Sequence, residues 1–562
     1  DHLRLELASR DAILDFPRLF RDPLELRKLS GRIDLLLDDA GWRLRTDRLV
    51  ADSPHIATRT RLDLQAQHGR SPFVDLQTDF RDADAAYAQR YYPTGVLRKT
   101  LVEWLDHAIV SGRVVSGTAL LHGSLDQFPF ETSRNGIFQT TFATEDVVLD
   151  YRAGWPRIEQ LDAQVRFHGN QLEIEADSGT IYDSRITGVG AHIERLKPPS
   201  AIHIQGQLEG PLQDVLRALE EDALRDRFGQ FAAALRGTGG SRLALDFSVP
   251  LTENGDHVLD GKLSFTDARL SLPAWDLTLD KIQGDLNFDL DGLAATGIRG
   301  RALRAPVTLD VLPADDGATR VRTRGTFSVP NISRQLPAIP LQMAEGKAAF
   351  VVDVDIPSNR SAANDPILLA VDSDLEGIRI DLPEPFGKSS EASRTLAVRL
   401  PLGGDATTGR LDYGGEVSAA FSGDGPRVDL MFGQTAEPQD EPGIRVGGRL
   451  RQLDVTAWRS ALARLQSDNR QEPPPLTIDL EIDELLAGPL SIDQLHLRLA
   501  RRAGIWWGAA DAADLAGSFR FSQTLSESPL RIDLGRLHLR LPIADQDAAA
   551  SPPPDANTGP DP

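Results

Sequence analysis

Apolar and polar residues alternate along most of the chain, with Asp, Glu, Arg, Gln and Thr between the apolar positions. The alternation is already present at Leu3 and is still present at Leu499. A period of two is typical of β-strands with one apolar and one polar face. We therefore predict an all-β dominated fold, a long twisted antiparallel sheet with one apolar face. If each strand and its turn take about 14–15 residues, the chain holds about 30–35 strands.

Helical periodicity is confined to a few short segments. Apolar residues between Val96 and Ile109 fall on one stripe of a helix. Pro211 can begin a second helix, and Gly237 ends that stretch. A third, shorter helix is predicted from Asp454 to residue 465. We expect these few α-helices to cap the sheet.

The domain organisation follows from changes in this periodicity and from polar, proline-rich stretches. A tail of Ala, Pro, Asp, Ser, Asn and Gly is expected to be disordered or to act as a linker. The predicted segments are an N-terminal β-segment (1–80), a helical insertion (81–112), a β-segment (113–210), a helix (211–237), β-repeats (238–433), a linker (434–445), a strand with a short helix (446–465), a Pro-rich linker (466–475), a β-segment (476–547) and the tail (548–562).

Composition and charge exclude several classes of function. The 61 Lys and Arg residues against 83 Asp and Glu give a net charge of −22, which opposes binding to nucleic acid. Cysteine is absent, so disulfides, Cys-based zinc sites and thiol catalysis are excluded. No uninterrupted apolar stretch approaches the ~18 residues of a membrane-spanning helix. Because the chain begins at Asp1, we expect it to be a segment of a longer protein.

Motifs for catalysis, metals and cofactors are not found. The eleven histidines have no H-x-x-H or H-E-x-x-H spacing, and there is no Walker loop. Ser184 and Ser522 lack the flanking glycines of a nucleophile elbow. Asp479 and Glu481 lie on the polar side of a predicted strand, where solvated charge is the ordinary interpretation. The sequence predicts no cofactor and argues against an enzyme.

The segment Leu382-Pro383-Glu384-Pro385 interrupts the strand pattern. Two prolines cannot donate ladder hydrogen bonds, so we expect a rigid corner at a sheet edge, with a rim where lipid or a partner docks as the alternative. Lys388 could meet a phosphate head group, but we expect it to be solvated.

Three groups of short motifs resemble one known family. The first group contains YYP at 91–93, WLD at 104–106, GTALLHG at 117–123, FPF at 128–130 and GWPRI at 154–158. The second contains SDLEGI at 373–378 and DLPEPFGK at 381–388, and the third GGRL at 447–450, LD at 453–454 and Trp458. In this order they resemble the YhdP branch of the AsmA-like family, TamB-related bridge-like phospholipid transport proteins of the Gram-negative envelope.

The resemblance implies a non-enzymatic lipid conduit that contributes to the outer-membrane barrier. It implies a periplasmic body, anchored to the inner membrane in the full-length protein, that carries phospholipids between the inner and outer membranes along an apolar β-groove. The partners would be phospholipid acyl chains and, through parts missing from this segment, the two membranes. No nucleic-acid partner is expected.

The residues themselves are compatible with the same fold, a long twisted antiparallel sheet rolled into an elongated groove with an apolar interior. An open sheet of this size has far more exposed apolar area than a soluble monomer tolerates, so either a second sheet covers it or something apolar fills a trough. Acyl chains suit a trough, since their burial is worth ~0.8 kcal/mol per CH2. A structural or adhesive β-repeat protein and a β-helix enzyme acting on polysaccharide remain alternatives. We predict eighteen lining positions on one shared face: Val165, Phe167, Leu172, Ile174, Leu243, Leu245, Phe247, Val249, Leu263, Phe265, Leu270, Leu272, Leu286, Phe288, Leu290, Val307, Leu309 and Val311.

Overall fold

The computed structural model describes most of the chain, and the predicted tail at 548–562 lies outside the described residues, as do 466–473 of the Pro-rich linker. The described residues are 1–95, 97–130, 136–196, 200–222, 225, 232–233, 235–250, 258–273, 276–290, 292–314, 318–336, 339, 341–357, 366–402, 408–422, 427–465, 474–502, 504–522 and 530–538. They form two compact units, which consist mainly of Asp1–Thr323 and of Arg324–Asp355 with the described residues from 366 onward.

The predicted sheet is confirmed. Thirty strands of the described residues belong to one hydrogen-bonded sheet, and only the hairpin of β2 and β3 lies outside it. Most neighbours are antiparallel and successive in the chain. A β-helix, in contrast, has parallel neighbours, so the pairing disfavours the predicted alternative of a polysaccharide-acting β-helix.

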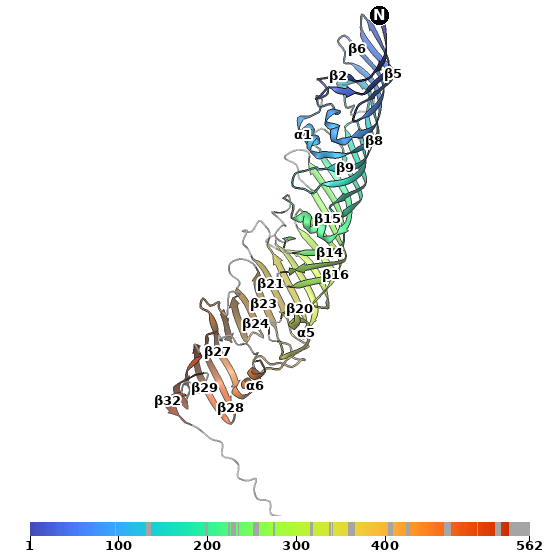
Figure 1. The fold of residues 1–562 in the computed structure, drawn as a ribbon. Helices are drawn as coiled ribbons and strands as arrows, with labels where there is room; N and C mark the ends of the chain where they lie inside the picture. The colour runs from blue at the N-terminus through green and yellow to red at the C-terminus, as the bar shows by residue number, and fades with distance from the viewer. Residues whose placement is uncertain are drawn as a thin grey trace, which may run out of the picture. The chain divides into compact units, whose positions relative to one another are not determined.

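The strands of the first unit are long, and most alternate between exposed and half-buried residues. Figure 1 shows β14, β15 and β16 side by side. The strands are β1 (His2–Ser9), β2 (Ala12–Leu14), β3 (Leu24–Leu26), β4 (Lys28–Asp38), β5 (Gly41–Asp52), β6 (Ala57–Gln67), β7 (Phe73–Asp84), β8 (Ile109–Ser124), β9 (Gly136–Leu149), β10 (Ile158–His168), β11 (Gln171–Ile181), β12 (Ser184–Ile193), β13 (Ala201–Pro211), β14 (Arg236–Pro250), β15 (Val258–Leu272), β16 (Leu277–Asp289), β17 (Leu293–Ala302) and β18 (Ala305–Pro313), with β19 (Thr319–Ser328) at the boundary of the units.

The strands of the second unit are shorter on average. They are β20 (Ala344–Ile356), β21 (Ile367–Ser373), β22 (Ile378–Ile380), β23 (Leu396–Leu402), β24 (Thr408–Tyr413), β25 (Val417–Ser422), β26 (Arg427–Phe432), β27 (Gly443–Asp454), β28 (Leu476–Ala487), β29 (Leu490–Arg502), β30 (Ile505–Asp511), β31 (Leu515–Ser522) and β32 (Arg531–Leu537).

Helices are few among the described residues, as the sequence pattern predicts. The helix expected from Val96 is α1 (Lys99–Ala108), with Val96 itself outside the described residues. The helix expected after Pro211 is α2 (Leu212–Leu219), and the one expected after Asp454 is α6 (Val455–Leu465). Further helical elements are the 3-10 turns η1 (Ala85–Arg90) and η2 (Leu125–Gln127) and the short helix α5 (Val329–Gln335).

Bulges recur in successive strands of the first unit. The register shifts around Gln160 in β10, Asp267 in β15 and Lys281 in β16, each of which has a positive φ of 49–53°. A bulge adds one residue to one strand, which bends the strand and increases its twist. The bulges therefore curve the sheet locally, and the alternation pattern does not reveal them.

Two strand pairs of the second unit are parallel, unlike the other pairs whose register the structure describes. β27 lies between β26 and β28 and runs parallel to both. Parallel neighbours need a crossover, and α6 provides the one between β27 and β28. The crossover from β26 to β27 packs on the sheet, where Ala436 is buried and the backbone N–H of Glu437 donates to Asp429.

The segment around 374–395 folds back over β24 and β26. The ring of Phe386 packs on Tyr413, Phe432 and Trp458 at centroid distances of 5.7–6.3 Å. Our expectation that Lys388 is solvated is wrong, because only 9% of it is exposed. Its ammonium donates hydrogen bonds to the carbonyl oxygens of Leu375, Ile378 and Ser389, and burial lowers its pKa. Lys388 therefore holds this segment together and is not available to a phosphate group.

Candidate functional site

The strand register places apolar residues from many strands on one face, which we call the apolar face. Residues directly opposite each other in neighbouring strands point to the same side of a sheet. One row of directly opposed residues crosses nine strands, from β7 to β15. It consists of Phe80, Gly117, Phe142, Val165, Ile174, Ala191, Ile204, Phe247 and Leu259.

Three further rows flank the first one on the same face. Each contains a residue of β10 or β14 that lies two or four positions from a member of the first row, and residues an even number of positions apart on a regular strand point to the same face. The rows are Phe167, Leu172, Ile193, Ile202 and Val249; Val189, Gly206, Leu245, Gly261, Phe288 and Leu293; and Ile186, Leu208, Leu243, Leu263 and Leu286. The apolar face is thus continuous over these strands, since every residue in a row has its neighbour directly opposite.

Twelve of the eighteen predicted lining positions lie in these rows or, for Phe265, alternate with a row member on the same strand. Leu270 and Leu272 follow the bulge of β15 and lie opposite Leu279 and Leu277. Leu290 follows the last residue of β16 and is 39% exposed. The remaining three lie on β18: Val307, Leu309 and Val311 are opposite Gly300, Ile298 and Ala295.

The apolar face has a covered margin and an open strip. Leu212 and Leu216 of α2 lie over Gly237 of β14, and both leucines are buried. The margin includes further buried residues on the following strands, namely Leu263, Ile282, Ile298, Val307 and Leu309. In the open strip, Leu245, Phe247 and Phe288 remain half-exposed. Half-exposed apolar side chains in adjacent rows are a surface to which apolar ligands bind.

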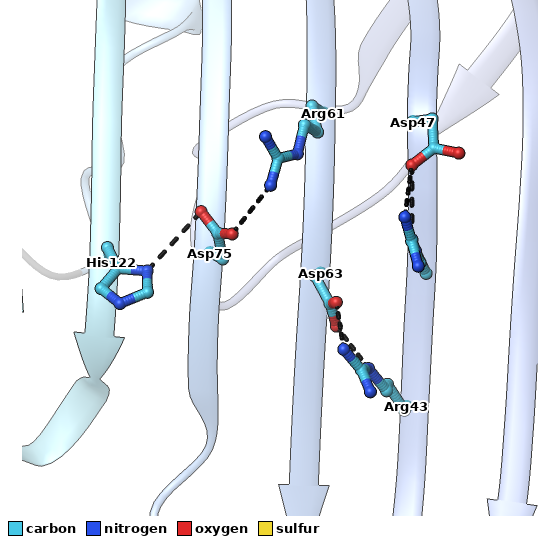
Figure 2. Close-up of polar contacts among 7 residues, drawn as sticks. Arg43, Asp47, Arg61, Asp63, Asp75 and His122 are labelled. Carbon is cyan, nitrogen blue, oxygen red and sulfur yellow. Dashed lines mark hydrogen bonds and ion pairs between the residues drawn. The ribbon is translucent and has the colours of Figure 1, made fainter.

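The opposite face is polar and carries ion pairs between strands. Arg43 of β5 donates to Asp63 of β6 at 2.8 Å, and Arg61 of β6 donates to Asp75 of β7 at 3.1 Å. Figure 2 shows both pairs. Asp63 and Asp75 lie directly opposite each other, which places two like charges together. Arg43 compensates the first and Arg61 the second, each from a diagonal position on the neighbouring strand. His122 of β8 lies 3.6 Å from Asp75.

A hollow of about 900 Å³ lies over β12–β17. Residues of the polar rows dominate its lining, including Gln205, Gln207, Asp246, Asp260, Lys262 and Asn287. The side chains that would flank a hollow on the apolar face, such as Leu243 and Phe247, are not among the lining residues. The lining does include Leu245 and Phe288 of the open strip, but the residues on either side of them along their strands belong to polar rows, so we assign the hollow to the polar face.

Within the described part of the chain, no three His, Asp or Glu side chains come together as metal ligands would. None of the helices described is both long and apolar enough to span a bilayer. The apolar face is the extended feature of these strands, and its rows of apolar side chains could contact a long apolar ligand.

Comparison with known proteins assigns the chain to a family. The family model described as YhdP protein matches residues 1–559. The chain belongs to the YhdP family. A YhdP relative from Escherichia coli (strain K12), named as intermembrane phospholipid transporter YhdP, is 22% identical over 408 residues. The match covers 71% of this chain and 31% of that YhdP protein, so the chain spans less than half of its length. No solved structure matches.

Proposed function

We propose that this chain is a non-enzymatic conduit segment that holds phospholipid acyl chains on its apolar face and passes them along the strand order. The observation that carries the proposal is the row of directly opposed apolar residues from β7 to β15. An acyl chain lying across the strands gains ~0.8 kcal/mol for each CH2 group buried, without needing a directional contact. The eighteen predicted positions are proposed as its lining.

The name of the Escherichia coli relative supports a role in phospholipid transport. Because that protein is a phospholipid transporter between membranes, we place this chain in the periplasm as part of a longer protein anchored to the inner membrane. Its partners would be phospholipids and, through other parts of that protein, the inner and outer membranes. The polar face, with its cross-strand ion pairs, would face water.

Photo-crosslinking at adjacent residues tests the proposal. The purified chain carries a photoreactive amino acid at Leu245 or at its neighbour Asp246 and is incubated with vesicles of phosphatidylethanolamine and phosphatidylglycerol. Strand neighbours point to opposite faces, so lipid should be labelled from position 245 and not from 246. The pairs Phe167 with Arg166 and Leu272 with Ser271 repeat the comparison. Equal labelling at both members of each pair would contradict a lipid-binding apolar face.

A further inference from the structure

Among the described residues, four glycines of the sheet lie directly opposite a phenylalanine whose ring covers them. Gly284 and Gly448 also face phenylalanines, but a Cβ there would first meet Ile298 or the Phe432 backbone. In the first unit, Gly117 is opposite Phe80 and Gly261 is opposite Phe288. In the second unit the pairs are Gly409 with Phe421 and Gly508 with Phe519. In all four, a Cβ added to the glycine would lie closer than 3.0 Å to carbons of the facing ring. Each ring therefore lies flat across the neighbouring strand and occupies the space that a side chain would fill.

The backbone does not explain these glycines. None of the four has the positive φ that favours glycine, although many other glycines of the chain do. Glycine inside a strand weakens the strand, so a position that tolerates it needs another reason. The facing ring supplies one, because covering a cross-strand glycine with an aromatic ring recovers buried apolar area. The rings nevertheless stay half-exposed, with one side open.

The four pairs lie beside further apolar side chains. The two pairs of the first unit belong to the rows described above, where Gly117 also faces Phe142. Gly261 has Phe288 on one neighbouring strand and Leu245 on the other. Gly508 likewise has Phe519 on one side and Leu499 on the other. Leu400 reaches Gly409 from the next strand in the same way. Every pair thus has further apolar side chains beside it. A ring that stood up from the sheet would rise above these neighbours, whereas a flat ring stays level with them.

We propose that the four ring-over-glycine pairs set the depth of the lipid-binding surface and so the clearance for an acyl chain. This inference rests on the proposed function. A side chain at the glycine position cannot coexist with the flat ring, so the ring turns outward into the space where the acyl chain lies. The glycines are therefore specificity-determining residues although they need not touch the ligand themselves.

The test compares three variants for phospholipid retained per chain after incubation with vesicles of phosphatidylethanolamine and phosphatidylglycerol. G261V should retain about fourfold less phospholipid, which corresponds to losing the burial of about one CH2 group. G261V combined with F288A removes the displaced ring and should restore retention. The matched control is G190V, because Gly190 lies in a polar row and a Cβ there has nothing within 4 Å.

Thermal unfolding of each variant shows whether a loss of phospholipid retention comes from a displaced ring or from a chain that no longer folds. Reduced retention in G261V with restoration in the double variant supports the proposal, and G508V with F519A repeats the test in the second unit if G261V does not fold. Retention at the unsubstituted level in a folded G261V would overturn it, as would a loss of retention that removing the ring does not restore. If the unsubstituted chain retains no phospholipid, the proposed function fails, and the inference fails with it.

Discussion

Arg445 of β27 donates two hydrogen bonds of 2.7 Å to the carboxylate of Asp429, its direct neighbour on the parallel strand β26. The Asp429 side chain is fully buried, and the backbone N–H of Glu437 donates to it as well. One carboxylate thus joins two parallel strands to the crossover between them. This contact stabilises the region where described strands depart from antiparallel order.

Replacing Asp429 tests this contact. D429N should lower the free energy of unfolding by about 2–3 kcal/mol, because buried hydrogen bonds to a charged group are lost. The matched control is D483N. Asp483 forms a similar ion pair with Arg449, but the Asp483 side chain is 43% exposed. Exposed pairs contribute about 0–1 kcal/mol, so the control should change little. Urea unfolding of the two variants measures the difference, and equal losses would contradict the assignment.

The same contact predicts a dependence on pH. Burial would raise the pKa of Asp429, but the hydrogen bonds from Arg445 and Glu437 outweigh it and hold the pKa below the ordinary 3.8. A carboxyl whose pKa is lower in the folded state contributes stability above its unfolded pKa and loses it as pH falls through the folded pKa. The melting temperatures of the unsubstituted chain and D429N should therefore converge below pH 3.8. A gap of constant size from pH 7 to pH 3 would contradict the prediction.

Lys388 is expected to matter for folding and not for lipid head groups. K388M removes this donor from the carbonyl oxygens of Leu375, Ile378 and Ser389, of which that of Leu375 still accepts from the backbone N–H of Ile378. A buried acceptor left unsatisfied costs about 1–3 kcal/mol. The melting temperature should fall, while the exposed counterpart K262M should leave it nearly unchanged. If K388M melts normally but retains less phospholipid, the side chain acts on the ligand instead.

A row of like charges on the polar face should limit stability. Asp260 lies directly between Asp246 and Asp289 on the adjacent strands. D260K would convert two unfavourable pairs into favourable ones, each worth about 0.2–1 kcal/mol, so the chain should become more stable. The gain should shrink in high salt, which screens exposed charges. D285K is the control, because Asp285 already pairs with Lys262 at 2.7 Å, and this variant should be less stable.

A charge placed in the open strip should obstruct the ligand more than the fold. Leu245 is half-exposed, so the carboxylate of L245D can reach water and the stability loss should be modest. An acyl chain next to an unpaired charge loses favourable burial, so phospholipid retention should fall. L263D is the comparison, because Leu263 is only 6% exposed and a charge there should unfold the region. Similar melting temperatures for L245D and L263D would argue against an open strip.

The sequence predicts the strands well because alternation is a local property that each segment carries itself. Positions such as Val165 and Phe247 share a face whenever the register between them is regular, so a common face could be expected. The bulges at Asp267 and Lys281 could not, because a positive φ at Asp or Lys has no compositional signal. The parallel strands and the burial of Lys388 depend on contacts between distant segments. The pairing of Gly261 with Phe288 needs the register itself, which only the structure supplies.

The order in which strands pair also bears on how the chain acquires its structure. Within each unit, nearly every strand has the preceding strand as one of its partners, so contacts are short in sequence and loop-closure costs are small. A growing chain can add one hairpin at a time to a folded edge and need not await distant segments. At each stage the newest strand offers a free edge to wrong partners. Such a fold can be lengthened or shortened by whole hairpins during evolution without a change in the rest of the core.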